Sequence, residues 1–254
     1  MHKKLNTQLV TELKKFKAPT RPEMFHGENY VGGGSSKLIF WNLSMPDVRS
    51  LQSRNLVVKN QPLDVQFTAF EKIWKTAKVF ELKTISIHWL EKLSDQDLVR
   101  YAPQILTWAN EVDNWAHSDA LCGIFARIFE ASPKSVLRTY KAWNRHKNPW
   151  LRRCSMVGLF YYSRSRKSLP SFKLASSMIK PHLNAPEYYV QKAVGWTIRE
   201  MYNVYPQETL QFIEVNLDSI HPNAWYASSE KLPLKIKNKL VIRRKLMRRE
   251  MPKK

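Results

Sequence analysis

Apolar residues recur at three- and four-residue intervals along most of the chain, clearly so from about residue 62 onward. Short polar or proline-containing breaks separate these segments, and no long alternating strand pattern intervenes. An interval of three to four residues is that of an amphipathic α-helix. Only seven glycines are available for hairpins and bulges. The pattern therefore predicts a nearly all-α fold.

Breaks between these segments predict where individual helices begin. Residues 64–93 are predicted to form two helices that meet near Lys78, and residues 94–112 begin at a Ser94 or Asp95 cap. Pro133 occupies a first-turn position, where its missing N–H costs nothing. Further helices are predicted over residues 1–16, 113–130, 132–146, 148–164, 171–183, 185–205 and 206–217, the last being the final clear helix.

The helices recur at a spacing of about forty residues. Trp115 and Arg153 lie 38 residues apart, and Arg153 and Trp196 lie 43 apart. This period is typical of HEAT and armadillo repeats, in which each helical pair buries a face only against its neighbours. We therefore predict a single HEAT-like helical-repeat domain over residues 1–254, a solenoid with a concave groove. A simple helical bundle is the alternative.

One predicted helix, residues 113–130, carries two residues away from its apolar stripe. Four side chains gather on one face of the helical wheel, namely Leu121, Ile124, Phe125 and Ile128. Trp115 and Asp119 are four residues apart and fall together on nearly the opposite side. A large aromatic ring beside a carboxylate, turned away from the core, indicates a functional surface.

A second helix, within residues 185–205, repeats this arrangement with cations. Its apolar stripe consists of Val190, Val194, Ile198 and Met201. Trp196 projects opposite, with Lys192 and Arg199 about one turn away on either side. A lone tryptophan of this kind often packs against the next repeat. An aromatic face flanked by Lys and Arg also suits a nucleotide, whose base stacks while the cations take its phosphates.

The charge balance favours a polyanionic partner. The chain holds 42 Lys and Arg against 21 Asp and Glu, a formal net charge of +21, which makes the predicted groove basic. No apolar run of about 18 residues exists, so no membrane association through a spanning helix is predicted. Residues 231–254 carry eleven Lys or Arg and one acidic residue, Glu250. This basic C-terminal tail is either solvated or lies along phosphates beside the groove.

Motifs for metals and cofactors are missing from the sequence, and we predict neither. Cys122 and Cys154 lack CxxC spacing, and the seven histidines form no HExxH or HxE pattern. The glycines within residues 31–36 lack the spacing of a phosphate-binding loop. They predict a flexible connection, or else backbone lying against a phosphate, in a helical and glycine-containing N-terminal segment, residues 1–40. Cysteine usage and the polar character of residues 1–16 predict a reducing cytoplasmic compartment.

Other titratable residues near position 119 have structural interpretations. Glu111 and Asp113 are two residues apart, but the string NEVDN is more typical of a helix cap than of paired catalytic carboxylates. His117 lies about 160° from Asp119 on the helical wheel, two residues away. We therefore predict a structural role for His117.

Three strings, NWAHSD (114–119), NPWLRR (148–153) and VQKAVGWTIRE (190–200), resemble the AlkD-like DNA alkylation repair family of HEAT-repeat DNA glycosylases. The looser SMPDVR (44–49) and IWKTAKVFELK (73–83) are similar to earlier segments of that family. The resemblance covers roughly residues 40 to 235. The order and separations of the strings make the set specific, and they agree with the repeat period.

The resemblance implies roles for the residues that match. Asp119 corresponds to the catalytic carboxylate, and Trp115 and Trp196 correspond to the aromatic pair that contacts the lesion and its sugar. An alkylated purine that carries a positive charge leaves without protonation, and oxocarbenium character then develops on the deoxyribose. A carboxylate near that sugar stabilises the charge and orients water, while electron-rich rings attract a cationic base.

The resemblance also implies which cations hold the DNA backbone. Arg153 matches the active-site arginine and Arg199 a backbone-contacting cation. Lys192, about one turn from Trp196, is a further candidate for binding the DNA backbone. Tyr30 is the nearest candidate for the family's N-terminal active-site tyrosine. The chain departs from the family pattern here, because FWN (40–42) replaces a more usual glycine-containing turn.

Together these features predict an alkylpurine DNA glycosylase. It would hydrolyse the N-glycosidic bond of cationic alkylated purines, of the 3-methyladenine and 7-methylguanine type, in duplex DNA. The resemblance implies that it does so without deep base flipping. The resemblance implies a monomer in a bacterial cytoplasm, associated with the nucleoid. Two alternatives remain: a non-catalytic HEAT-repeat protein that binds unusual DNA structures, and a scaffold that binds an acidic protein.

Overall fold

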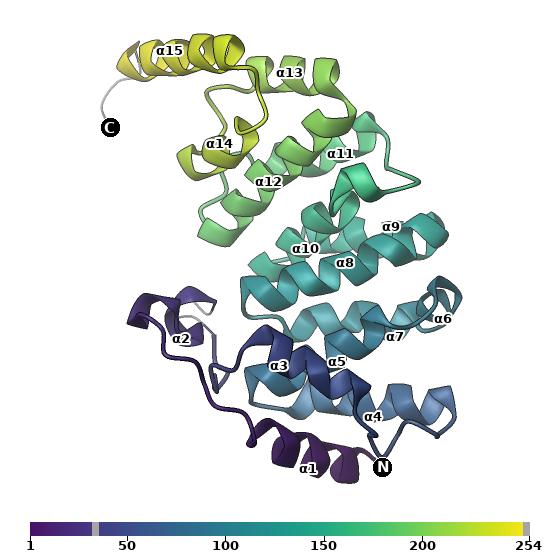
Figure 1. Cartoon of the computed structure of the whole chain (residues 1–254). Coiled ribbons are helices and arrows are strands. Elements are labelled where there is room, and N and C mark those ends of the chain that lie inside the picture. Colours follow the sequence, from purple (N-terminus) through teal and green to yellow (C-terminus); the bar gives the residue numbers. More distant parts are fainter. Residues whose placement is uncertain (32–35, 251–254) are drawn as a thin grey trace. The chain divides into compact units, whose positions relative to one another are not determined.

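The computed structural model describes residues 1–31 and 36–250, with side chains through Met247. The regular structure of these residues consists of helices and short 3-10 turns, apart from one isolated parallel bridge between Ile39 and Val79 (Figure 1). The prediction of an all-α fold is confirmed. The interpretation of the glycine stretch as a flexible or phosphate-contacting connection falls mostly on residues 32–35, which lie outside the described residues.

The chain divides into two compact units, Met1–Ile124 and Phe125–Lys254, and the boundary falls inside helix α8 (Trp115–Ala131). The first unit contains α1 (His2–Leu13), α2 (Gly27–Tyr30), α3 (Met45–Ser50), α4 (Leu63–Thr76), α5 (Phe80–Glu91), α6 (Asp95–Arg100) and α7 (Ala102–Thr107). The second contains α9 (Pro133–Asn144), α10 (Pro149–Phe160), α11 (Phe172–Ile179), α12 (Tyr188–Val204), α13 (Pro206–Val215), α14 (Pro222–Ser228) and α15 (Leu234–Glu250).

Helix starts and stops follow the sequence signals closely. The chain breaks between α4 and α5 at residues 77–79, as predicted near Lys78. The Ser94 hydroxyl caps α6 by accepting from the Asp97 backbone N–H at 3.1 Å, and Pro133 opens α9. The helix predicted over 94–112 is wrong in one respect, because it divides at Tyr101 into α6 and α7. Pro103 stands in the first turn of α7, where it lacks the N–H that a continuous helix needs.

Leucines spaced four residues apart in α1 form part of the core of the first unit. Leu5, Leu9 and Leu13 of α1 are fully buried and belong to the apolar cluster formed with α4 and α5. This spacing brings one side of the helix to the core at every turn. The amphipathic helix predicted over residues 1–16 is therefore confirmed, and the first unit begins with a packed element.

In the second unit, α12 lies between α10 and α14 (Figure 1). Its predicted stripe is fully buried, with no exposed surface on Val190, Val194, Ile198 or Met201. Contact between α10 and α12 is what the repeat spacing of about forty residues predicts. The pattern of apolar positions thus fixed the buried face of α12 correctly.

The structure adds two helices, α14 and α15, after the one that the sequence predicts as the last clear helix. Cations occur on every side of α15, which hides its periodicity. Leu240 and Arg244 are nonetheless buried, and the Arg244 guanidinium donates to the carbonyls of Leu217 (2.6 Å) and Ile220 (2.9 Å). The described part of the basic tail therefore contacts its own unit through Leu240 and Arg244, while most of its cations with described side chains are exposed. The solvated tail and the phosphate-binding tail both stay predictions. Residues 251–254 lie outside the described residues.

Close approach of α12 and α14 depends on Gly195. A Cβ at this position would lie closer to the Ala224 carbonyl oxygen than real Cβ atoms come to any heavy atom. In an open helix, Gly→Ala stabilises by up to about 1 kcal/mol. We expect Gly195→Ala instead to lower the free energy of unfolding by roughly 1–3 kcal/mol, because the helices must move apart. Urea denaturation followed by circular dichroism measures this, and a stabilised variant would contradict the close contact.

Candidate functional site

The first turns of α8 present Trp115 and Asp119 away from the core. Asn114 caps the helix, since its Oδ1 accepts from the backbone N–H of His117 at 2.9 Å. The predicted stripe of α8, from Leu121 to Ile128, is buried, whereas Trp115 and Asp119 are both half-buried. Residues four apart on a helix are about 5–6 Å apart at Cβ. The indole and the carboxylate therefore share one partly exposed surface, as the sequence predicts.

Asp113 does not cap α8 with its side chain. Its carboxylate accepts from the Ser36 hydroxyl at 3.0 Å and from the Lys37 backbone N–H at 2.8 Å. The string NEVDN caps the helix as predicted, but through Asn114. Asp113 instead fastens the chain that follows the glycine stretch to the start of α8, which no local sequence pattern indicates.

The N-terminal segment brings Tyr30 against Trp115. The Trp115 indole N–H donates to the Tyr30 carbonyl at 3.0 Å, and the two rings meet edge to face with centroids 5.6 Å apart. Phe25 extends the row, with its ring centroid 5.8 Å from that of Tyr30. The Tyr30 side chain is 53% exposed. Tyr30, the candidate for the N-terminal tyrosine of the site, thus lies in direct contact with Trp115. The sequence did not predict that Phe25 joins them.

Asn42 positions the short helix that carries Tyr30. Its backbone has φ 60°, in the left-handed region that Asn and Gly tolerate best. Its side-chain Oδ1 accepts from the Gly27 N–H at 2.6 Å, and Gly27 packs so tightly on the Phe40 ring that a Cβ there would collide with it. Asn42 therefore holds FWN in a turn of left-handed backbone and ties it to the start of α2.

In the second unit, Arg153 is held inside the protein. Its residue is 6% exposed, and one guanidinium nitrogen donates to the Tyr189 carbonyl at 2.9 Å. The Tyr189 ring lies 4.9 Å from that of Trp150. Burial raises the pKa of the Tyr189 hydroxyl. Arg153 is therefore a rigidly oriented cation, and its contact with a DNA phosphate stays a prediction.

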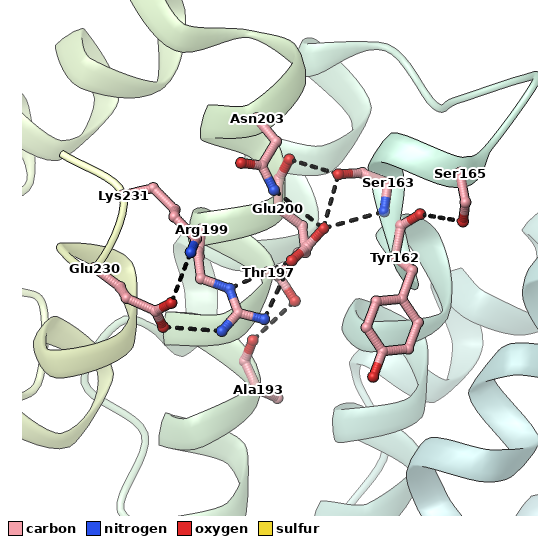
Figure 2. Close-up of polar contacts among 10 residues, drawn as sticks. All are labelled: Tyr162, Ser163, Ser165, Ala193, Thr197, Arg199, Glu200, Asn203, Glu230 and Lys231. Atoms are coloured by element: carbon pink, nitrogen blue, oxygen red, sulfur yellow. Dashed lines mark hydrogen bonds and ion pairs between the residues drawn. The ribbon is translucent and has the colours of Figure 1, made fainter.

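Trp196 is half-buried and has one of its two predicted cations on its ring. The Arg199 guanidinium lies 5.6 Å from the indole centroid, whereas the Lys192 ammonium lies 5.9 Å from the ring of Tyr226. Arg199 also pairs with two carboxylates, Glu200 at 3.2 Å and Glu230 at 3.0 Å (Figure 2). Arg199 therefore lies against Trp196, as the sequence predicts. Its ion pairs with Glu200 and Glu230 could not be predicted from the sequence.

Glu230 lies 31 residues from Arg199 in the sequence, and no spacing signal links them. Hydrogen bonds from Lys231 and Arg199 lower the pKa of the Glu230 carboxyl. Glu200 is 6% exposed, and its carboxylate accepts from the Ser163 N–H at 3.1 Å and the Ser163 hydroxyl at 2.8 Å. Glu200 thus joins the loop after α10 to the Trp196 helix.

Neither a metal cluster nor a membrane-spanning helix is found in the described part of the chain. Within residues 1–31 and 36–250, no three His, Cys, Asp or Glu side chains gather closely enough to hold a metal ion. Over the same residues, no helix combines the length and apolar character needed to cross a bilayer.

Comparisons with known proteins agree with this architecture. A search of curated proteins finds no match. The fold is similar to a predicted DNA alkylation repair enzyme from Enterococcus faecalis, with a TM-score of 0.60, 17% identity, and coverage of 78% of this chain and 90% of that one. It is also similar to AlkD2 from Streptococcus mutans, with a TM-score of 0.55, 14% identity, and coverage of 89% and 98%.

These likenesses confirm the predicted helical-repeat fold. Residues 11–232 match the family model described as DNA alkylation repair enzyme, and this range is most of the chain. The match confirms the resemblance read from NWAHSD, NPWLRR and VQKAVGWTIRE. The protein belongs to the DNA alkylation repair enzyme family.

Proposed function

We propose that the protein is a DNA glycosylase that hydrolyses the N-glycosidic bond of cationic alkylated purines, of the 3-methyladenine and 7-methylguanine type, in duplex DNA. One observation carries this proposal. The Tyr30 and Trp115 rings form a partly exposed aromatic pair, and Asp119 lies one helical turn from Trp115 on the same side of α8.

Asp119 is the proposed catalytic residue. A cationic alkylated purine is already a good leaving group, so the enzyme needs no acid to protonate it. Positive charge grows on the deoxyribose as the bond breaks, and a nearby carboxylate stabilises that charge and orients the attacking water. The half-buried position of Asp119 keeps it accessible to substrate while removing part of the water that would screen its charge.

Aromatic side chains are proposed to hold the lesion. The faces of Trp115 and Tyr30 attract a cationic base or the developing sugar cation, by up to about 2 kcal/mol each where water is excluded. Trp196 is assigned the same role, which the Arg199 guanidinium 5.6 Å from the centroid of its ring supports. The partly exposed pair of Tyr30 and Trp115 supports recognition without deep base flipping.

Phosphate contacts are proposed for Arg153, Lys192 and Arg199, on a basic groove that binds duplex DNA as a monomer. Arg153 and Arg199 are pre-oriented by the Tyr189 carbonyl and by Glu200. Such partners fix the direction of a cation before DNA arrives. The formal charge of +21 supplies the long-range attraction for the duplex.

Release of free base tests the proposal directly. Duplex DNA treated with a methylating agent is incubated with the protein, and released methylpurines are separated by chromatography. We expect 3-methyladenine or 7-methylguanine in the soluble fraction. Tight duplex binding with no released base would instead favour a non-catalytic DNA-binding protein.

Trp115→Ala should reduce excision by up to about 30-fold, because the lesion loses one aromatic face worth up to ~2 kcal/mol. Affinity for undamaged duplex should stay nearly constant, and Trp115→Phe should retain part of the activity. Single-turnover excision and a binding titration measure the two effects.

Trp89→Ala is the matched control, since Trp89 is a half-buried tryptophan whose ring stacks on Phe70 in the apolar core. It should lower stability and leave excision by folded molecules unchanged. A loss of about 3–5 kcal/mol of stability in Trp115→Ala would show that Trp115 serves packing.

A further inference from the structure

Tyr162 follows the end of α10 in an unfavourable backbone conformation. Its φ is 46° and its ψ 62°, in the left-handed region that bulky residues rarely adopt. The residue is 61% exposed, so the turn does not bury it. Such conformations cost free energy and persist where the surroundings enforce them, often at functional sites. Folding alone gives no reason for an aromatic residue at this position.

The residues that follow Tyr162 hold this turn from two sides. Ser163 is buried and donates both its backbone N–H and its hydroxyl to the Glu200 carboxylate. The Ser165 hydroxyl donates to the Tyr162 carbonyl at 2.8 Å (Figure 2). A buried carboxylate with several donors is a rigid anchor. Glu200 therefore fixes the turn that presents the Tyr162 ring.

Two other aromatic rings surround Tyr162 within the second unit. Its ring centroid lies 4.7 Å from that of Tyr161 and 6.4 Å from that of Trp196, with edge-to-face angles of 79° and 82°. In each contact the edge of one ring meets the face of the other, and together the two contacts orient the phenol. With most of the Tyr162 side chain exposed, the arrangement leaves it able to stack on an incoming planar group.

Tyr162 also lines a cavity of about 490 Å³, within the size range of small-molecule sites. Its charged lining residues are Arg164, Arg199, Glu200, Glu230 and Lys231. Arg199 is paired with both carboxylates, and Lys231 is paired with Glu230 at 3.1 Å. Three cations against two carboxylates leave one positive charge in excess. An aromatic ring beside an excess of cations is the combination that binds a nucleotide.

We propose that this cavity is a nucleotide subsite. Tyr162 stacks on a base that has left the duplex stack, and Arg164 and Lys231 hold the phosphate of that nucleotide. The subsite depends on the proposed function in one respect only, namely that the nucleic acid the protein binds is DNA. Because every base has a π-face, the subsite accepts any unstacked base and is not specific for an alkylated one.

A fluorescent base tests the stacking step. The probes are a duplex with one bulged 2-aminopurine, whose emission is quenched on an aromatic ring, and the same duplex with the 2-aminopurine paired. We expect Tyr162→Leu to lose the quenching and to bind the bulged probe roughly 10-fold more weakly, while binding the paired probe normally.

Tyr188→Leu is the control, since Tyr188 is a 53% exposed tyrosine of the same unit that does not line the cavity. It should quench and bind both probes as the unsubstituted protein does. Equal quenching by Tyr162→Leu and the unsubstituted protein would overturn the proposal.

A second variant separates function from folding. Tyr162→Asn places a residue that tolerates left-handed backbone into the turn, so stability should be unchanged or higher. Its binding of the bulged probe should still fall as in Tyr162→Leu. A clear loss of thermal stability in Tyr162→Asn would make the ring structural and overturn the proposal.

The phosphate contact is tested by salt dependence. Arg164→Gln should flatten the log–log salt slope for the bulged probe by about 0.7–0.9, the value for one phosphate. Lys173→Gln, an exposed lysine on α11, should leave the slope unchanged. An unaltered slope in Arg164→Gln would overturn this contact.

The test of the subsite is independent of the glycosylase proposal, because neither probe contains an alkylated purine. If the protein quenches 2-aminopurine through Tyr162 but releases no methylated base, the glycosylase proposal is refuted and the subsite stands.

Discussion

Asp119→Asn is expected to lower the rate of base release by about 100- to 1000-fold, the size of effect seen when one group that stabilises transition-state charge is removed. The amide keeps the size of the side chain but removes the negative charge that faces the developing sugar cation. Affinity for alkylated duplex should be unchanged or higher, because a carboxylate near phosphates repels them before the reaction. Single-turnover excision at saturating protein measures the chemical step without the binding step.

Glu111→Gln is the matched control for this substitution. Glu111 is exposed shortly before α8 and has no place in the proposed site, so its loss should leave excision unchanged. The thermal midpoint of Asp119→Asn should stay close to that of the unsubstituted protein. Full activity in Asp119→Asn would assign catalysis to another residue, and failure to fold would assign Asp119 to structure.

Lowering the pH from 7 to 5 is expected to reduce the free energy of unfolding by on the order of 4 kcal/mol, mainly through two buried histidines. Burial lowers the pKa of His88 to about 4 and that of His117 to about 3, with nearby positive charge from Arg49 and Lys83 adding to the effect. Each group destabilises the fold by about 1.4 kcal/mol for every pH unit below 6.5, the ordinary value, until its folded pKa is reached.

The sign follows from proton binding. Between pH 6.5 and about 4, the unfolded chain protonates both histidines and the folded chain neither, so acid favours unfolding. Glu81 acts in the opposite direction, because burial raises its pKa and the folded state takes up its proton first. Burial also lowers the pKa of His182, which adds to the loss in the same direction as His88 and His117. The expected result is a net loss set by three buried histidines against one carboxyl.

The structure shows why His117 resists protonation. Its Nδ1 lies 3.0 Å from the Asn114 side-chain amide, which donates because its oxygen accepts from the His117 backbone. A proton on Nδ1 would face that donor and break the cap of α8. His117 also stacks on Phe80 at 4.3 Å and is 2% exposed, which confirms its predicted structural role.

Urea unfolding at a series of pH values between 7 and 5 measures the slope. His88→Gln and His117→Gln should each flatten it clearly, since each removes one of the buried histidines responsible, and the slope that remains in both variants includes the contribution of His182. His146→Gln, a substitution at an exposed histidine, should leave it unchanged. A slope that neither buried variant alters would show that other groups govern the acid sensitivity.

Local periodicity was sufficient for most helices between α4 and α13 and for the buried faces of α8 and α12, but it missed the break between α6 and α7 and the helices α14 and α15. The stripes of α8 and α12 are buried as predicted, because in a helix of 3.6 residues per turn the apolar positions alone decide which side leaves water. Caps and breaks were equally local, as at Ser94 and Pro133. The positions of Trp115, Asp119 and Trp196 off those stripes followed from the same geometry, which is why a candidate site could be predicted from sequence.

Contacts between residues far apart in the chain could be decided only by tertiary structure. Tyr30 meets Trp115 across 85 residues, and Arg199 meets Glu230 across 31, and no period relates either pair. The turn at Asn42 and the exposed ring of Tyr162 are likewise enforced by neighbours in space. A helical wheel gives the direction of a side chain, but what it meets there depends on the path of the rest of the chain.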